Sequence, residues 1–129
     1  MNKLILLRHG QSQWNLENKF TGWKNVPLTE KGEIEAKKAG ELIKEKKIKF
    51  NSFYSSYQKR ANDTLKIIMK ELNEDENLII KKWQLNERHY GELTGLNKED
   101  MKKKYGEEKI HQFRRSWDCL LYTSPSPRD

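Results

Sequence analysis

The sequence has few cysteines, which could crosslink a small secreted domain, and no long apolar segment, which could anchor it in a membrane. It contains a single cysteine, Cys119, so no disulfide can form within the chain, and a reducing compartment is the simplest expectation. No apolar run approaches the ~20 residues that a membrane-spanning helix needs. The first apolar stretch, residues 4–7, is too short for the core of a secretory signal. We therefore expect a soluble, cytoplasmic protein without a membrane partner.

Hydrophobic residues are also scarce, at 34% against 35% charged residues, so any core must be small or incomplete. Lysine and arginine outnumber the acidic residues by 26 to 19, which gives a net charge of +7. Such a balance suits nucleic acid, a membrane surface or a small polyanionic substrate. Most of the basic residues are lysines scattered along predicted helices, a pattern typical of a solvated helix face. Nucleic acid is therefore not an expected partner, and a basic binding module without enzymatic activity is only an alternative.

The order of the predicted elements indicates an α/β fold with a largely parallel sheet. Short apolar runs predict strands over residues 4–7, 49–55 and 78–80, the first of them buried on both faces. Helical periodicity predicts helices over residues 30–46, 58–72 and 98–105, and a last helix from about residue 107. The first long helix carries a face of mostly small residues, which is expected to lie close against the sheet. That face consists of Ala36, Ala39, Gly40 and Ile43.

One domain is expected over residues 1–118. The last eleven residues, 119–129, have a low charge density, contain Ser-Pro-Ser-Pro and show neither helical nor strand periodicity. We interpret them as an unrelated or disordered tail, and favour a sequence artefact over a natural tail.

Chemically useful side chains gather where the first predicted strand ends. Arg8 and His9 follow this strand directly, and functional groups collect beyond the carboxyl ends of strands in open α/β sheets. Gly10 permits a sharp turn or the close approach of a ligand, and Ser12 and Asn15 add a hydroxyl and an amide. An imidazole beside a permanent cation suits a group that attacks or carries phosphate. For His9 taken alone, a structural histidine at a strand end is the alternative.

Two further segments contribute charged candidates. Arg60 lies in the first turn of a predicted helix, where a cation opposes the helix dipole, and this indicates a role toward a ligand. An ordinary surface arginine is the alternative. Residues 86–95 carry a dense set of ionisable groups beside two glycines, which predicts a functional loop.

Together these segments resemble the cofactor-dependent phosphoglycerate mutases of the histidine phosphatase superfamily, over roughly residues 3–118. The Arg-His-Gly triplet marks only the superfamily. The segment Glu-Arg-His-Tyr-Gly at 87–91, followed by Gly-Leu-Asn-Lys at 95–98, is more specific to the mutases. The other matching segments are Leu-Arg-His-Gly-Gln-Ser-Gln-Trp-Asn at 7–15, Phe-Thr-Gly-Trp at 20–23, Leu-Thr-Glu-Lys-Gly at 28–32, Lys-Arg-Ala at 59–61 and Arg-Arg-Ser at 114–116. The resemblance implies a three-layer α/β/α fold with a mostly parallel sheet, here truncated.

The resemblance also implies a role for each matching residue. His9 is expected to be phosphorylated on its imidazole and to pass the phosphoryl group to a substrate hydroxyl. Arg8 and Arg60 match cations at the transferring phosphate, and Glu87 matches the proton donor and acceptor for that hydroxyl. An ion pair with Arg88 is the structural alternative for Glu87. The remaining positions match substrate-binding residues: Gly10, Ser12, Asn15, Thr21, Gly22, Arg88, Tyr90, Lys98, Arg114 and Arg115.

The resemblance implies an isomerase of glycolysis and gluconeogenesis that interconverts 3-phosphoglycerate and 2-phosphoglycerate. It is primed by 2,3-bisphosphoglycerate, needs no metal, and binds small phosphorylated three-carbon acids; a homo-oligomer remains open for the full-length protein. Family members are about twice as long, and a second catalytic histidine, followed by Gly and Asn, lies in the half that has no counterpart here. We therefore expect little or no activity from these residues alone. A phosphatase of the same superfamily is the alternative activity.

Overall fold

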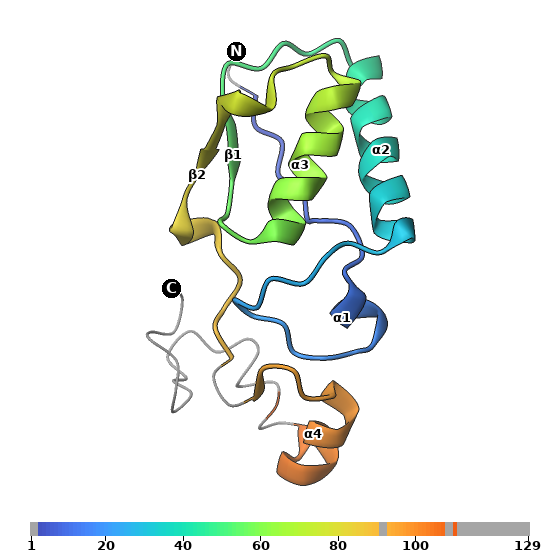
Figure 1. The fold of residues 1–129 in the computed structure, drawn as a ribbon, viewed down its shortest axis with the longest axis vertical. Coiled ribbons are helices and arrows are strands. Elements are labelled where there is room, and N and C mark those ends of the chain that lie inside the picture. Colours follow the sequence, from blue (N-terminus) through green and yellow to red (C-terminus); the bar gives the residue numbers. More distant parts are fainter. Residues whose placement is uncertain (1–2, 91–92, 108–109, 111–129) are drawn as a thin grey trace.

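The computed structural model describes residues 3–90, 93–107 and 110. Helices α2 and α3 lie side by side on one side of strands β1 and β2, and α1 lies between this helix pair and α4 (Figure 1). The elements in chain order are α1 (Gln13–Leu16), α2 (Glu30–Glu45), β1 (Phe53–Ser55), α3 (Lys59–Glu71), the 3₁₀ turn η1 (Glu76–Leu78), β2 (Ile79–Lys81), the 3₁₀ turn η2 (Trp83–Leu85) and α4 (Lys98–Tyr105). The predicted α/β organisation is confirmed.

Strands β1 and β2 pair in parallel, with Phe53 opposite Ile79 and Ser55 opposite Lys81. Helix α3 connects them, because parallel strands need a crossover rather than a tight turn. Both strands end at the same edge of this small sheet. The segments that follow them therefore start side by side, and this brings Arg60 and Glu87, 27 positions apart in the sequence, to one place.

Two of the predicted helices begin and end as their capping residues indicate. Thr29 accepts a hydrogen bond from the Gly32 N–H at the start of α2. Asn97 accepts hydrogen bonds from the second and third N–H groups of α4, which ends at Gly106 with a φ of 86°. These bonds satisfy backbone groups that the helix itself leaves unpaired.

The small-residue face of α2 packs against α3, and the expectation that it lies against the sheet is wrong. A Cβ atom built on Gly40 would lie 2.9 Å from the Cβ of Glu71 in α3, so only glycine fits at this crossing. At the other end of α2, a Cβ on Gly10 would lie 2.3 Å from the carbonyl oxygen of Gly32. Gly10 thus allows a close backbone approach, as expected, although its neighbour is the first turn of α2.

The prediction of a buried strand over residues 4–7 is wrong for this structure. The segment has no strand assignment, and the exposed fractions of Leu4 and Leu6 are 80% and 82%. A strand forms only against a partner, and in the described part of the chain β1 and β2 pair with each other alone. The apolar run therefore lies without a neighbouring strand. Unpaired strand segments and exposed apolar side chains agree with the expectation of a truncated sheet.

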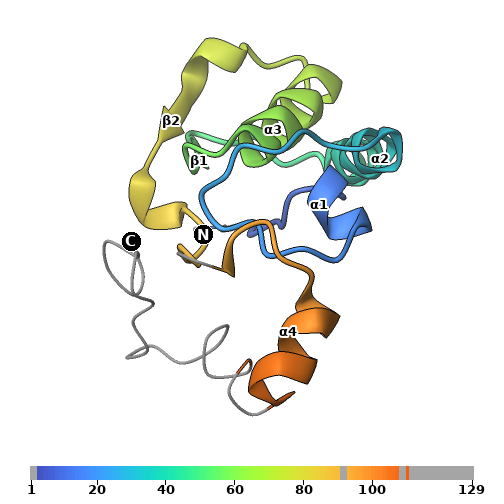
Figure 2. The ribbon, with the colours of Figure 1, turned by 60° about the horizontal axis from the view of Figure 1, so that its bottom comes forward.

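A cluster of buried apolar residues connects the segment that follows β2 to the segment that follows α1. Phe20, Tyr90, Leu93 and Ile110 are all buried there, with Met101 packed against them. The rings of Phe20 and Tyr90 meet at 4.9 Å between centroids. Figure 2 shows the chain that precedes α4 passing beside the segment around α1, and this cluster fixes the two segments to each other.

Candidate active site

Arg60 is the centre of the candidate site. It lies in the first turn of α3, and its side chain is fully buried. Its Nη2 donates to the Gly22 carbonyl at 2.6 Å and to Oε2 of Glu87 at 2.6 Å, and its Nη1 donates to the Lys24 carbonyl at 2.9 Å. A buried guanidinium requires such partners, because an unpaired buried charge is costly. The alternative of an ordinary surface arginine is wrong.

His9 lies beside Arg60 in a defined tautomer. Its Nδ1 lies 2.6 Å from the Gly10 carbonyl oxygen, which can only accept, so Nδ1 carries the proton. The other ring nitrogen, Nε2, then has a free lone pair and accepts a hydrogen bond from Nε of Arg60 at 3.3 Å. Nε2 is therefore the ring nitrogen with the available lone pair, and the imidazole is neutral in this arrangement.

The surroundings of His9 favour this neutral form. Burial lowers the pKa of His9 below its usual 6.5, and the positive charges of Arg60 and Arg8 lower the pKa further. The hydrogen bond to the Gly10 carbonyl and the carboxylate of Glu87 act in the opposite direction without reversing the shift. A neutral imidazole at neutral pH is the form that can attack phosphorus.

We expect the His9 ring to titrate below pH 6.5 in an NMR pH series that follows its Cε1–H signal. Between the folded pKa and 6.5 the unfolded chain binds more protons than the native chain, so the free energy of unfolding falls as the pH drops through this window. In the Glu87→Gln variant the midpoint should move lower still, because a negative charge that raises the pKa is removed. A midpoint at or above 6.5 would contradict the assigned environment.

Glu87 completes the cluster from the segment that follows β2. Its Oε2 meets Arg60, and 38% of its side chain is exposed, so the carboxylate is held on one side and open on the other. The main chain of Glu87 is held by two side chains: the Trp23 indole N–H donates to its carbonyl at 2.7 Å, and its N–H donates to Oε1 of Gln58 at 3.1 Å. The predicted partners His9, Arg60 and Glu87 are thus brought together. The ion pair that Glu87 makes in this structure is with Arg60.

The segment around Gly22 contributes backbone acceptors to the cluster. Gly22 has a φ of 54°, a left-handed conformation that favours glycine. This turn presents its carbonyl oxygen to both Arg60 and Gln58. Thr21 is buried beside it. The backbone carbonyl of Gly22 therefore accepts a hydrogen bond from the buried guanidinium of Arg60.

Ser12 and Asn15 form a capping box at the start of α1, an element that the sequence did not predict. The Ser12 hydroxyl accepts from the Asn15 N–H, and the Asn15 side chain accepts from the Ser12 N–H. Ser12 is fully buried. Both residues thus use polar atoms to order the turn that follows His9.

The structure also describes four other predicted ligand-binding residues, Arg8, Arg88, Tyr90 and Lys98. Arg8 is exposed and acts on His9 through its charge. Arg88 is buried, Tyr90 packs on Phe20, and the backbone N–H of Lys98 donates to the Asn18 carbonyl at the start of α4. Arg114 and Arg115 lie outside the described residues, as does the segment 119–129.

The sequence analysis did not identify Gln58 and Trp23, whose side chains bind the backbone of Glu87. One signal existed for Gln58: it precedes α3 at the N-cap position, where glutamine is not a favoured capping residue. In the structure its side chain indeed makes no capping bond. Trp23 gave no comparable signal.

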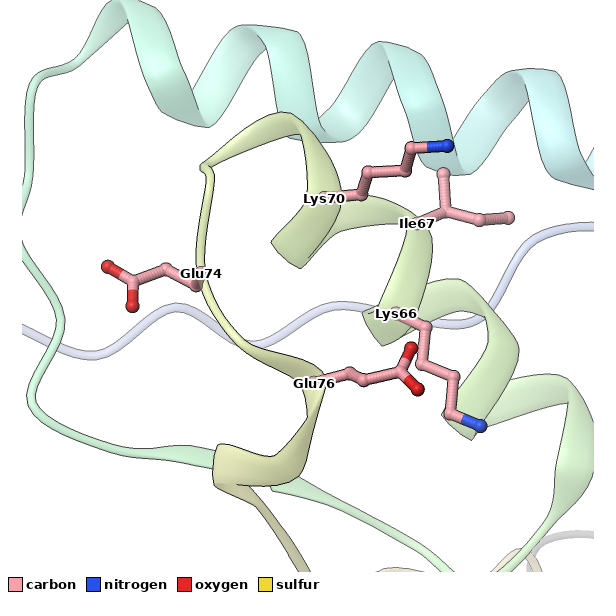
Figure 3. Close-up of a pocket in the computed structure, with 5 residues that line it drawn as sticks. All are labelled: Lys66, Ile67, Lys70, Glu74 and Glu76. Atoms are coloured by element: carbon pink, nitrogen blue, oxygen red, sulfur yellow. The ribbon is translucent and has the colours of Figure 1, made fainter.

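We also searched the rest of the described chain for pockets, metal-binding groups and membrane-spanning helices. A separate open pocket of about 300 Å³ lies along the C-terminal half of α3 and the segment that follows it (Figure 3). Its lining residues are Lys66, Ile67, Lys70, Glu74 and Glu76. Among the described residues, no group of three or more His, Cys, Asp or Glu side chains could hold a metal ion. Within the same residues, no helix has the length and apolarity needed to cross a membrane.

Comparison with known proteins agrees with this geometry. The sequence profile of the Histidine phosphatase superfamily (branch 1) matches residues 4–129. A protein of Pelagibacter ubique named 2,3-bisphosphoglycerate-dependent phosphoglycerate mutase is 64% identical over 118 residues, which are 92% of this chain and 49% of that protein. A Lactobacillus johnsonii protein named 2,3-bisphosphoglycerate-dependent phosphoglycerate mutase 1 is 54% identical over 93% of this chain and 52% of its own length. The chain spans about half the length of these relatives.

Solved structures share the fold. The chain is similar to Bacillus stearothermophilus YhfR with a TM-score of 0.73 and 24% identity, over 91% of this chain and 56% of that one. It is similar to the phosphoglycerate mutase of Bacillus anthracis with a TM-score of 0.68 and 24% identity, over 84% of this chain and 53% of that one. At this identity the likeness concerns the fold alone.

Proposed function

The chain belongs to the histidine phosphatase superfamily, branch 1, and on that premise we propose that it is part of a phosphoglycerate mutase. The proposed reaction interconverts 3-phosphoglycerate and 2-phosphoglycerate through a phosphohistidine on His9, with 2,3-bisphosphoglycerate as the priming phosphoryl donor. The observation that carries this proposal is the buried Arg60, which joins the nucleophilic nitrogen of His9 to the carboxylate of Glu87. The Pelagibacter ubique relative bears the name of this activity.

The three residues divide the chemistry between them. The Nε2 lone pair of His9 attacks phosphorus, the bond from phosphorus to the substrate oxygen breaks, and Glu87 in its protonated form supplies the proton that this oxygen needs and becomes a carboxylate. In the return step a substrate hydroxyl attacks the phosphohistidine, Glu87 takes the hydroxyl proton, and the P–N bond breaks to restore the neutral imidazole. Such proton transfer typically contributes ~10²–10⁴-fold to the rate.

Arg60 neutralises charge on the group in transit. Its Nε–H points at the nucleophilic nitrogen in this structure, so attack requires that this hydrogen bond is exchanged for one to a phosphate oxygen. A guanidinium can bind phosphate through two parallel donors, and positioning with charge neutralisation is most of what phosphoryl transfer requires. We assign Arg8 to the same phosphate because its charge already acts on His9.

The remaining substrate contacts complete the proposal. We assign neutral donors around the phosphate to Ser12, Asn15, Thr21 and Gly22, and we assign Gly10 to the substrate-binding positions beside His9. We assign the distal carboxylate or phosphate of the three-carbon acid to a second set: Arg88, Tyr90, Lys98, Arg114 and Arg115. A fully buried cation beside a neutral imidazole suits an anionic primer such as 2,3-bisphosphoglycerate. We further propose a cytoplasmic, metal-free enzyme of glycolysis and gluconeogenesis, of which residues 1–118 form one part and residues 119–129 a foreign or disordered tail.

We expect little turnover from the 129 residues alone, because a second catalytic histidine is expected in the half of the relatives that this chain does not match. Activity is therefore best measured in a chimera, in which residues 1–118 replace the matching segment of the Pelagibacter ubique relative. We expect this chimera to convert 3-phosphoglycerate to 2-phosphoglycerate, and 2,3-bisphosphoglycerate to stimulate the conversion. The direct readout is isomer formation by NMR, with free phosphate measured in the same sample.

The same experiment separates the mutase from a phosphatase of the superfamily. Dominant release of inorganic phosphate, unaffected by 2,3-bisphosphoglycerate, would contradict the mutase assignment and leave a hydrolase that uses the same His9. The 129-residue chain, assayed beside the chimera, measures how much the missing half contributes.

A further inference from the structure

Gln58 occupies an unusual position between β1 and α3. It is the N-cap residue of α3, yet its side chain makes no capping hydrogen bond, and only 5% of the residue is exposed. Asn25 takes over part of the capping role, because its Oδ1 accepts a hydrogen bond from the Lys59 N–H. The Gln58 amide is therefore available for a different task, and a buried amide must find partners elsewhere.

Both ends of the Gln58 amide bond to segments that form the active site. Its Nε2 donates to the Gly22 carbonyl at 2.8 Å, and its Oε1 accepts from the Glu87 N–H at 3.1 Å. A backbone carbonyl can only accept and a backbone N–H can only donate, so the orientation of the amide is fixed by its partners. One planar group thus connects residues 22 and 87, both of which also bind Nη2 of Arg60.

These bonds form a closed ring with the catalytic ion pair. The Gly22 carbonyl that Gln58 binds also accepts from Nη2 of Arg60, and the same Nη2 binds the Glu87 carboxylate. Glu87 is held in this ring twice, through its backbone N–H and through its side chain. The ring matters because the segment from Asn86 to Tyr90 has no helix or strand of its own to fix the direction of the Glu87 side chain.

We propose that Gln58 is a positioning residue that sets the place of the Glu87 carboxylate for proton transfer. This inference rests on the proposed function, in which Glu87 gives a proton to the leaving oxygen of the substrate. The side chain of Gln58 acts through the main chain of Glu87 and through the Gly22 carbonyl. A misplacement of a catalytic group by about 1 Å can cost ~10²-fold in rate, so a ring of this kind has a measurable effect.

The test compares two phosphoryl donors in the chimera and its Gln58→Met variant, which keeps the length of the side chain and removes both hydrogen bonds. The alkoxide that leaves 3-phosphoglycerate or 2,3-bisphosphoglycerate needs a proton, whereas p-nitrophenolate leaves p-nitrophenyl phosphate without one. We expect the kcat for isomerisation to fall about tenfold, which is a fraction of the contribution of a general acid. The first-turnover burst of p-nitrophenolate should stay within about twofold, because it depends on His9 and Arg60 rather than on a proton donor.

The matched control is Gln84→Met, because Gln84 is exposed in the short turn before Asn86. It should leave both rates unchanged. Equal loss of isomerisation and burst in Gln58→Met would show a general structural role and overturn the proposal, and so would no loss in either. An unsubstituted chimera that does not isomerise would instead count against the proposed function.

A second measurement does not depend on turnover. In the 129-residue chain, hydrogen exchange of the Glu87 backbone N–H should be faster in Gln58→Met than in the unsubstituted chain or in Gln84→Met. Unchanged exchange at Glu87 would mean that Gln58 does not hold this main chain, and would overturn the proposal whatever the protein catalyses.

Discussion

The His9→Ala variant of the chimera is expected to incorporate no acid-labile phosphate from labelled 2,3-bisphosphoglycerate. The lone pair of Nε2 is the nucleophile in the proposed reaction, and the fixed Nδ1–H tautomer leaves no other nitrogen of this ring free to attack. Alanine removes the acceptor of the phosphoryl group, so the loss should be complete within detection. The measurement is label that survives alkali and is released by acid, mapped to a peptide by mass spectrometry.

The histidines that the proposal does not use provide the controls. His89→Ala and His111→Ala should keep the acid-labile label, since neither residue is assigned to phosphoryl transfer. Label that persists at full level in His9→Ala would show that the nucleophile is another residue. The Glu87→Gln variant should keep much of the label while isomerisation slows by roughly 10²–10⁴-fold, because glutamine cannot exchange the proton.

The sequence predicts best the helices whose ends are fixed by residues next to them in the chain. The helix that follows Asn97 begins and ends as expected, because its capping amide and its terminal glycine act within a few residues. The long helix after Thr29 also begins where predicted, because the Thr29 hydroxyl caps its first turn. The strand over residues 4–7 fails because a strand depends on a distant partner, and its apolar composition says nothing about whether that partner is present.

The residues of the candidate site likewise fall into those that the sequence predicted and those that it did not. The residue types around His9 point to a functional position, and the structure brings Arg60 and Glu87 to it although the strand predicted before His9 does not form. The unfavourable cation at the start of α3 also proved informative, since Arg60 is buried among acceptors. The support from Gln58 could not be predicted, because its partners lie 36 and 29 positions away and an amide can pair with almost any backbone group.

Arg60 is expected to have the largest combined effect on stability and chemistry, and two substitutions separate the two roles. Arg60→Met leaves the Gly22 and Lys24 carbonyls and the Glu87 carboxylate without their donor, which should lower the free energy of unfolding by about 3 kcal/mol. Arg60→Lys keeps the positive charge but replaces the planar guanidinium with an ammonium group. This variant should recover part of the lost free energy of unfolding, but it should not bind phosphate through two parallel donors.

Two assays measure these roles separately, one for the stability of the Arg60 variants and one for the phosphorylation of His9. Urea unfolding of the 129-residue chain measures stability, with Lys59→Met as the matched control, because its exposed pair with Asp63 contributes under about 1 kcal/mol. Phosphorylation of His9 in the chimera should fall roughly 10³-fold in both Arg60 variants, since both lose the Nε–H that lies beside Nε2 of His9 and that moves to a phosphate oxygen in the proposed reaction. If Arg60→Met unfolds at the same urea concentration as Lys59→Met, the buried ring of hydrogen bonds does not stabilise the chain. If Arg60→Lys phosphorylates His9 at the unsubstituted rate, charge alone suffices at this position, and the guanidinium geometry is needed only to hold Glu87 and Gly22 in place.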